Sequence, residues 1–295
     1  MQSADFLSAV FFYLKVGENL NQNWIVENLN NAFSTWNGKL GELWGLVTTG
    51  PQTFKGGAVW SVMQTLHNGM VGIGYALVVL FFAISLCKNT MNFHELKRPE
   101  AAIHYFLRFV AAKALVGYGM DIMLNVFSIC NGIVTDMADS MGGISEAMVL
   151  LPTEMQTAIE NVGFLASIPL WLVTILGSLF ITVLSFVMIL TVYGRFFRLY
   201  MYTALAPLPL AAFAGESTQS VGISFLKSYV GVCLEGAVIV LACVIYSAFV
   251  STPTVTSGEA TTIVWSYLAE TVFNMLVLVG LIKGSDRIIH EMMGL

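Results

Sequence analysis

The stretch Tyr193–Glu216 reads YGRFFRLYMYTALAPLPLAAFAGE and decides how this chain can fold. It follows a long apolar run, opens with two cations, and continues with small apolar residues that Pro207 and Pro209 interrupt. A proline inside a helix removes a backbone hydrogen bond, and it disfavours the helical conformation for the residue before it. We therefore expect one helix to end and another to begin here. Because freed carbonyls need partners in lipid, the segment at about 199–215 is predicted to be re-entrant; a proline-kinked ordinary span is the alternative.

The composition is that of a polytopic membrane protein. Of the 295 residues, 57% are hydrophobic and 11% are charged, whereas soluble domains carry about 25% charged residues. The mean hydropathy is +0.77. The 13 Lys and Arg are scattered, so no basic patch indicates a nucleic-acid-binding domain. The four cysteines lie in or beside apolar runs without a CxxC pair, which predicts free thiols.

The predicted fold is all-α, with about five transmembrane helices in addition to the re-entrant segment. The apolar runs that are long enough to cross a bilayer form a transmembrane domain over residues 58–295. The predicted spans are about 70–87, 106–130, 165–193, 229–250 and 263–282.

Residues 1–57 form a region of different character. Apolar residues recur there at spacings of three and four, which predicts two amphipathic helices interrupted by a polar turn near Asn19–Asn23. Such helices either lie on the membrane surface or pack on themselves as a small helical domain. Both alternatives are open from the sequence.

The distribution of cations predicts the topology, because Lys and Arg near span ends mark the cytoplasmic side. None occurs between Lys113 and Arg195 or between Lys227 and Lys283. Each gap holds two spans and the loop between them, so both loops are predicted to lie outside. The N-terminus is then outside and the C-terminus inside, and Arg195 and Arg198 are cytoplasmic anchors.

Polar residues at the ends of the predicted spans and within them are the candidate functional residues, since burying them in lipid is costly. They are Asp121, Lys227, Glu235, Ser266, Glu270 and Asn274. The last three follow one helical face at i, i+4 and i+8. These residues either line a hydrated pore or form hydrogen bonds between the helices of a bundle or oligomer. We find no catalytic, cofactor-binding or metal-ligand pattern, so an enzyme is not expected.

The order of these features resembles a known family. The run RFFRLYMYTALAPLPLAAFAGESTQSVGISFLKSYVGVCLEGAVIVL, residues 195–241, carries the resemblance most specifically. It resembles the TrbL/VirB family, the polytopic inner-membrane component of type IV secretion (conjugation) systems and the sixth VirB component. It looks like the versions encoded by Gram-positive conjugative elements. The resemblance covers roughly residues 58–290 and brings no catalytic motif with it.

The resemblance implies a channel or scaffold subunit for conjugative transfer of DNA with bound protein, located as a multi-pass protein in the plasma (inner) membrane. Its partners would be membrane lipids, further copies of itself, the secretion ATPases, the coupling protein and single-span scaffold proteins. It would meet the DNA–protein substrate indirectly and need no cofactor. The alternative is a small-solute transporter or ion channel subunit that uses Lys227, Glu235 and Glu270 around the broken segment. The missing repeat symmetry favours the secretion subunit.

Overall fold

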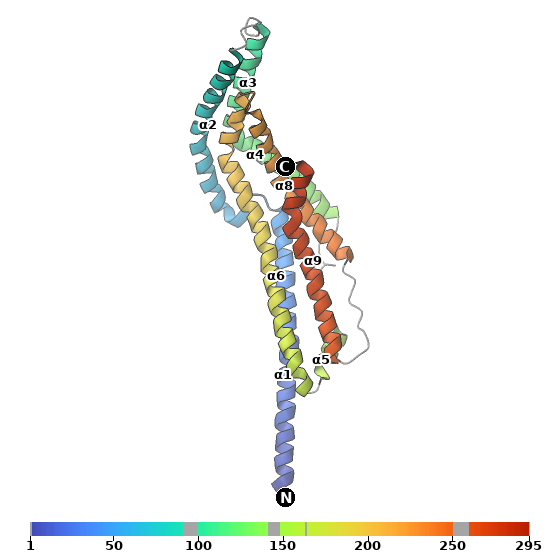
Figure 1. Ribbon diagram of the computed structural model, residues 1–295. Coiled ribbons are helices and arrows are strands. Elements are labelled where there is room, and N and C mark those ends of the chain that lie inside the picture. The colour runs from blue at the N-terminus through green and yellow to red at the C-terminus, as the bar shows by residue number, and fades with distance from the viewer. Residues whose placement is uncertain (1, 91–98, 141–147, 163, 250–259, 295) are drawn as a thin grey trace. The chain divides into compact units, whose positions relative to one another are not determined.

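The computed structural model describes residues 2–90, 99–140, 148–162, 164–249 and 260–294, and every regular element within these ranges is a helix (Figure 1). In chain order the elements are α1 (Gln2–Thr48), η1 (Phe54–Gly57), α2 (Ala58–Thr90), α3 (Pro99–Gly117), α4 (Gly119–Ser140), α5 (Thr153–Glu160), α6 (Phe164–Leu205), α7 (Pro207–Ala211), η3 (Ala212–Ala214), α8 (Gln219–Phe249) and α9 (Ala260–Met293). The all-α prediction is confirmed.

In the part of the chain that the structure describes, four helical stretches are long and apolar enough to cross a membrane. They are Phe54–Lys88, Ser167–Leu205, Gln219–Phe249 and Thr262–Met293. A fifth candidate is formed by Ile103–Gly117 and Gly119–Ser140 together. Each predicted span overlaps one of these stretches, which confirms a polytopic fold. The side of the membrane on which each loop lies stays a prediction.

The second predicted span is not straight. It is bent by 72° between α3 and α4, at Tyr118, which has a glycine on either side. Glycine weakens a helix and leaves room for close packing. A Cβ atom on Gly119 would lie 3.2 Å from Leu210 Cδ1, so a neighbouring segment occupies the space at the bend. Asp121 thereby falls in the first turn of α4, where a carboxylate complements the helix dipole.

The chain divides into two compact units, which are described separately. The first contains residues 1–44, 141–191 and 241–283; the second contains residues 45–140, 192–240 and 284–295. Helices α1, α6, α8 and α9 each contribute residues to both units. The domain boundary predicted at residue 57 therefore does not coincide with a boundary between the units.

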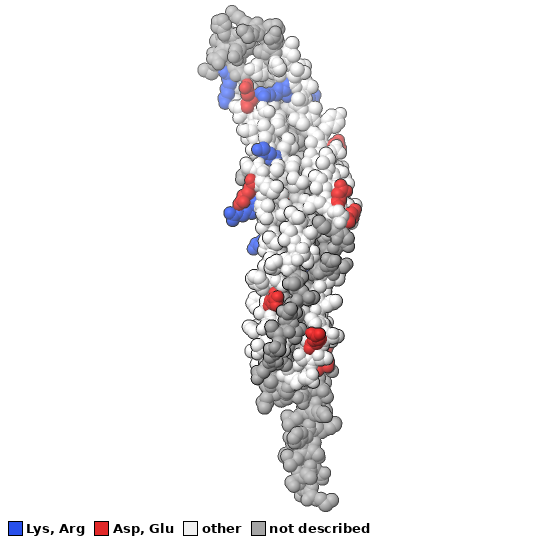
Figure 2. Space-filling view, turned by 90° about the vertical axis from the view of Figure 1, so that its right-hand side faces the viewer, with Lys and Arg blue, Asp and Glu red and all other residues white. Residues whose placement is uncertain are grey.

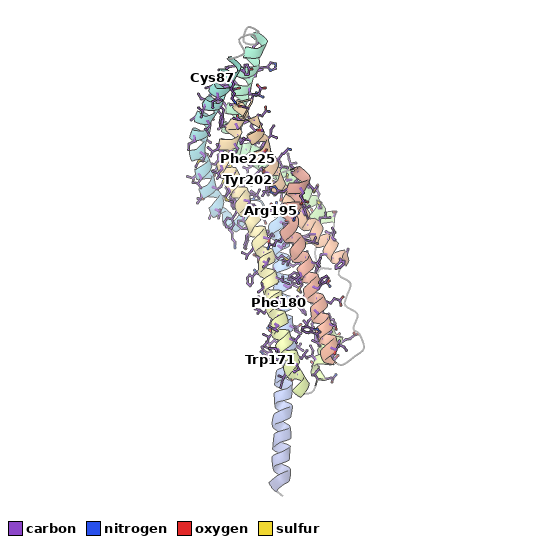
Figure 3. The ribbon with its side chains drawn as sticks, viewed as in Figure 1. Cys87, Trp171, Phe180, Arg195, Tyr202 and Phe225 are labelled. Atoms are coloured by element: carbon purple, nitrogen blue, oxygen red, sulfur yellow. The ribbon has the colours of Figure 1, made fainter. Side chains whose placement is uncertain are left out.

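In the first unit the apolar face of α1 is buried against protein. The residues of this face that belong to the unit are at most 2% exposed: Ile25, Leu29, Phe33, Trp36, Leu40 and Leu43. The Phe33 ring packs edge-on against Tyr267, with the ring centroids 6.5 Å apart. Trp24 lies against Trp171, with the centroids 5.7 Å apart (Figure 3). This burial favours packing on protein over a helix that lies on the membrane surface.

Two other features of the first unit differ from the predictions. Helix α1 runs without interruption from Gln2 to Thr48, so the turn predicted at Asn19–Asn23 is wrong; polar residues alone do not end a helix when no proline intervenes. The loop predicted between the spans 106–130 and 165–193 contains α5 and also binds α1. Asn37 donates from Nδ2 to the Val149 carbonyl at 2.8 Å and accepts from the Val149 N–H at 2.9 Å.

In the second unit the predicted break at the prolines is confirmed, with α6 ending at Leu205 and α7 beginning at Pro207. Ala206 nevertheless keeps helical angles (φ −49°, ψ −41°), contrary to the expectation for a residue before proline. The junction is therefore a local break in a nearly helical backbone, as in the kinked alternative. The chain leaves the helical conformation at Gly215 (φ −106°, ψ 141°) and turns before α8 begins. Entry of this segment into the membrane as a re-entrant loop stays a prediction.

The carbonyl freed by the first proline has a specific partner. Pro207 has no N–H, so the carbonyl of Thr203, four residues earlier, loses its helical hydrogen bond. His67 of α2 replaces it, with Nδ1 2.7 Å from the Thr203 oxygen and the imidazole buried. Since a carbonyl only accepts, Nδ1 carries the hydrogen. His67 thus replaces the hydrogen bond that the proline removes.

Small residues let α7 pack tightly against α2 and α3. A Cβ atom on Gly74 of α2 would lie 2.9 Å from both the Pro207 carbonyl oxygen and Val116 Cγ1. The alanines that were expected to permit close packing are at most 8% exposed: Ala204, Ala206, Ala211 and Ala212. The broken segment is accordingly held by protein contacts within the unit.

The predicted topology can be tested at two exposed positions, Ser140 on α4 and Arg287 on α9. In a chain whose native cysteines are replaced by alanine, Ser140→Cys should react with a membrane-impermeant thiol reagent added to intact cells. Arg287→Cys should react only after the membrane is permeabilised, because cations mark the cytoplasmic side. Labelling of Arg287→Cys in intact cells, or protection of Ser140→Cys, would contradict an outside N-terminus and an inside C-terminus.

Candidate functional site

The C-terminal end of α1 exposes backbone oxygens that need donors. The last four carbonyls of a helix lack backbone partners, and Val47 is followed four residues later by Pro51, which has no N–H. Arg195 reaches the Val47 oxygen through Nη1 at 3.4 Å. Asn131 donates to the Thr48 oxygen at 3.3 Å, and the Tyr200 hydroxyl donates to the Pro51 oxygen at 2.8 Å. Side chains from α4 and α6 therefore satisfy this helix end.

Arg195 is the most deeply placed cation among the described residues, with no exposed surface (Figure 3). Its Nε donates to the Val232 carbonyl at 3.2 Å, and its Nη2 donates to the Cys233 carbonyl at 3.1 Å. Gly236 makes this approach possible, because a Cβ atom there would lie 2.8 Å from both terminal nitrogens. One guanidinium thus joins the end of α1 to the middle of α8.

Arg198, one helical turn further along α6, has carboxylate partners instead. Its Nη2 lies 2.7 Å from both carboxylate oxygens of Glu235, and its Nη1 donates to Asp286. The Ser285 hydroxyl also donates to Glu235, at 3.2 Å. Glu235 is 1% exposed, whereas the Asp286 side chain is 43% exposed. These contacts connect α6, α8 and the last part of α9.

We call Arg195, Arg198, Glu235, Ser285 and Asp286 the arginine cluster. Its two cations balance its two carboxylates, as buried charges require if they are to remain ionised. Most of the described residues on the face shown in Figure 2 are neither acidic nor basic. A buried guanidinium can orient carbonyls and carboxylates, so the arrangement can stabilise helix packing.

Aromatic residues of α6 near the arginine cluster pack against rings of other segments. Phe54 stacks on Phe196 with the ring centroids 4.1 Å apart, and it meets Tyr193 edge-on at 5.6 Å. Tyr202 lies 5.6 Å from Phe225 of α8 (Figure 3). These rings pack η1 and α8 against α6.

The structure places only some of the predicted site residues together. Glu235 lies in the arginine cluster with Arg198, but the sequence did not indicate that they pair. Arg195 was predicted to be an anchor that faces the cytoplasm, whereas its side chain is buried in the second unit. Asp121 and Lys227 are exposed on α4 and α8.

The predicted polar stripe on α9 is split between two environments in the first unit. Asn274 is buried, while Ser266 and Glu270 are exposed. A pore-lining role for the stripe stays a prediction. Within the described ranges, no group of three or more His, Cys, Asp and Glu side chains is arranged to hold a metal ion.

Sequence reasoning missed Ser285 and Asp286. They lie just after the last predicted span, 263–282, and were not among the candidate residues. The one available signal was the pair of arginines three residues apart on α6, since two cations near an apolar run require acceptors. That signal predicts acceptors but not which residues supply them.

The close approach of Arg195 to α8 predicts that Gly236→Ala destabilises the protein. The added methyl group would overlap the buried guanidinium and force it away from the carbonyls that it binds, which costs about 1–3 kcal/mol in a packed interior. Gly194→Ala is the matched control, because a Cβ atom there meets nothing within 4 Å. The free energy of unfolding in mild detergent measures both. Equal stability of the two variants would refute the tight contact.

The pair of carboxylates predicts unequal effects of neutralisation. Glu235→Gln should lower the free energy of unfolding by at least about 2 kcal/mol, because it leaves the Arg198 cation with one partner in a buried site. Asp286→Asn should cost about 1 kcal/mol or less, since Asp286 is partly exposed and screened by solvent. The same unfolding measurement compares them. A larger loss for Asp286→Asn would reverse our ranking of the two interactions.

Comparison with known proteins identifies the family. A family model described as "TrbL/VirB6 plasmid conjugal transfer like protein" matches residues 36–207, which is more than half of the chain. The match begins inside α1 and ends at Pro207, so it includes both arginines of α6. No curated protein and no solved structure matches the chain. Together with the polytopic helical fold, the match shows that the chain belongs to the TrbL/VirB6 plasmid conjugal transfer family.

Proposed function

We propose that this protein is a channel or scaffold subunit of a type IV secretion apparatus that carries out conjugative DNA transfer. The observation that carries the proposal is the family match over residues 36–207, because this family is a structural component of conjugal transfer. The apolar helices make the chain a multi-pass membrane protein, and we place it in the plasma (inner) membrane.

The internal polar contacts support a scaffolding contribution. The donors at the end of α1, His67 at the broken segment and the arginine cluster all form hydrogen bonds inside the second unit. Such contacts hold helices in fixed positions without exposing charge to lipid. A subunit that must keep its arrangement beside moving partners benefits from that rigidity.

The proposal includes assembly with further copies and with other secretion proteins. Ser266 and Glu270 are polar, exposed and on one helix that is apolar enough to span a membrane. Exposed polar groups at such a position need partners outside the lipid, and a second copy of the chain could supply them. The secretion ATPases, the coupling protein and single-span scaffold proteins are the other proposed partners. The DNA–protein substrate would be met indirectly.

No specific observation favours the transporter or ion channel alternative. That alternative needs Lys227, Glu235 and Glu270 around the broken segment. Glu235 is engaged by Arg198 and Ser285. The broken segment itself is packed against α2 and α3.

Mating experiments test the proposal. Deleting the gene in a donor strain should reduce conjugative transfer to the background seen without donors, while growth and solute uptake stay unchanged. Expression of the full chain, or of the Gly194→Ala variant, should restore transfer. The Gly236→Ala variant should restore it less well because its helix packing is strained. Normal transfer from the deletion strain, at wild-type frequency, would rule out the proposed role.

A further inference from the structure

The second unit also contains a groove that lies outside the arginine cluster. Its volume is about 640 Å³, within the range of small-molecule sites. It lies between α3, the 3₁₀ turn η3 and the first residue of α8. Residues that line it include His104, Arg108, Leu115, Phe213, Glu216 and Gln219.

Opposite charges meet in this groove. Arg108 Nη2 donates to the Gln219 side-chain oxygen at 2.7 Å, and Arg108 Nη1 lies 4.0 Å from Glu216 Oε2. The side chains of Arg108 and Glu216 are 30% and 65% exposed. Their ion pair is therefore loose and open, so each charge can engage a ligand group of opposite sign.

From Arg108 towards the end of α3, the residues of this helix that line the groove are apolar. Leu115 lies about 10 Å along the axis of α3 from Arg108, at 1.5 Å per residue. Ala111 and Ala112 lie between them and also line the groove. A charged group followed by an apolar wall along a predicted membrane span matches the order of headgroup and acyl chain in a phospholipid. Arg108 is also one of the cations of residues 88–113, and the sequence predicts that these cations lie at a membrane surface.

We propose that this groove binds a zwitterionic phospholipid with a primary ammonium group, of the phosphatidylethanolamine type. The phosphate binds Arg108, the ammonium donates to Glu216, and an acyl chain lies along Ala111 and Leu115. Charged hydrogen bonds of this kind are strong and directional. An anionic headgroup would meet the Glu216 carboxylate, and a choline headgroup has no N–H to donate. The inference needs insertion into a membrane but not the proposed channel or scaffold role.

Native mass spectrometry of the full chain in mild detergent tests the proposal. The protein is incubated with equal amounts of phosphatidylethanolamine, phosphatidylglycerol and phosphatidylcholine that have identical acyl chains. We expect phosphatidylethanolamine to be retained at about tenfold higher affinity, the effect of one charged hydrogen bond. Preferential retention of phosphatidylglycerol or phosphatidylcholine, or equal retention of all three, would overturn the proposal.

Two charge variants assign the headgroup contacts. Arg108→Gln should lower retention of phosphatidylethanolamine and phosphatidylglycerol alike, by about tenfold. Glu216→Gln should remove the preference for phosphatidylethanolamine and increase retention of phosphatidylglycerol, because the repelling carboxylate is gone. Arg287→Gln, at an exposed cation elsewhere in the same unit, is the control and should change nothing. An unchanged lipid preference in Glu216→Gln would disprove the role of Glu216. Because this side chain is 65% exposed, misfolding would not explain a lost preference.

A steric variant tests the acyl-chain position. Ala111→Trp places a bulky ring in the groove at an exposed site and should abolish selective retention. Val110→Trp is the control, because Val110 is exposed on the same helix but does not line the groove. Selective retention by Ala111→Trp, or its loss in both variants, would contradict binding in this groove. Mating frequency is not among the readouts, so this result and the proposed function can fail independently.

Discussion

Carbonyl oxygens that lose their helical partners at prolines are the constraint on which the second unit depends. Pro51 and Pro207 have no N–H, so Val47 and Thr203 each need another donor. Water would supply one in a soluble protein, but an apolar helical interior requires a protein donor. Arg195 and His67 meet these needs from other helices. The same deficiency that breaks each helix thereby connects it to a neighbour.

The choice of donor follows from the number of acceptors at each place. Thr203 offers one carbonyl, and a single imidazole N–H suffices there. Around Arg195 three carbonyls converge, from α1 and from two successive residues of α8. A guanidinium has five N–H donors in a plane, whereas a lysine ammonium would direct three donors from one point. Gly236 is then needed because the planar group must lie flat on α8.

Much of the fold could be predicted, because apolar runs and prolines act locally along the chain. The spans and the break before Pro207 follow from composition and from the missing N–H. The 72° bend at Tyr118 was missed, since its apolar sequence continues through the glycines on either side. The predicted end of the broken segment, at about residue 215, agrees with the turn after Gly215. The packing of α7 against α2, which Gly74 permits, was missed, because such contacts between distant segments leave little trace in a local pattern.

The candidate site could be predicted less well, for a related reason. Arg195 and Arg198 are equivalent cations in the sequence, but they point about 60° apart around α6 and meet different acceptors. One binds carbonyls and the other binds Glu235 and Asp286. Intramembrane charges that suggested a pore are therefore partly used to hold helices together. The polar groups left exposed, such as Glu270 on α9, are those for which we propose a partner beyond this chain.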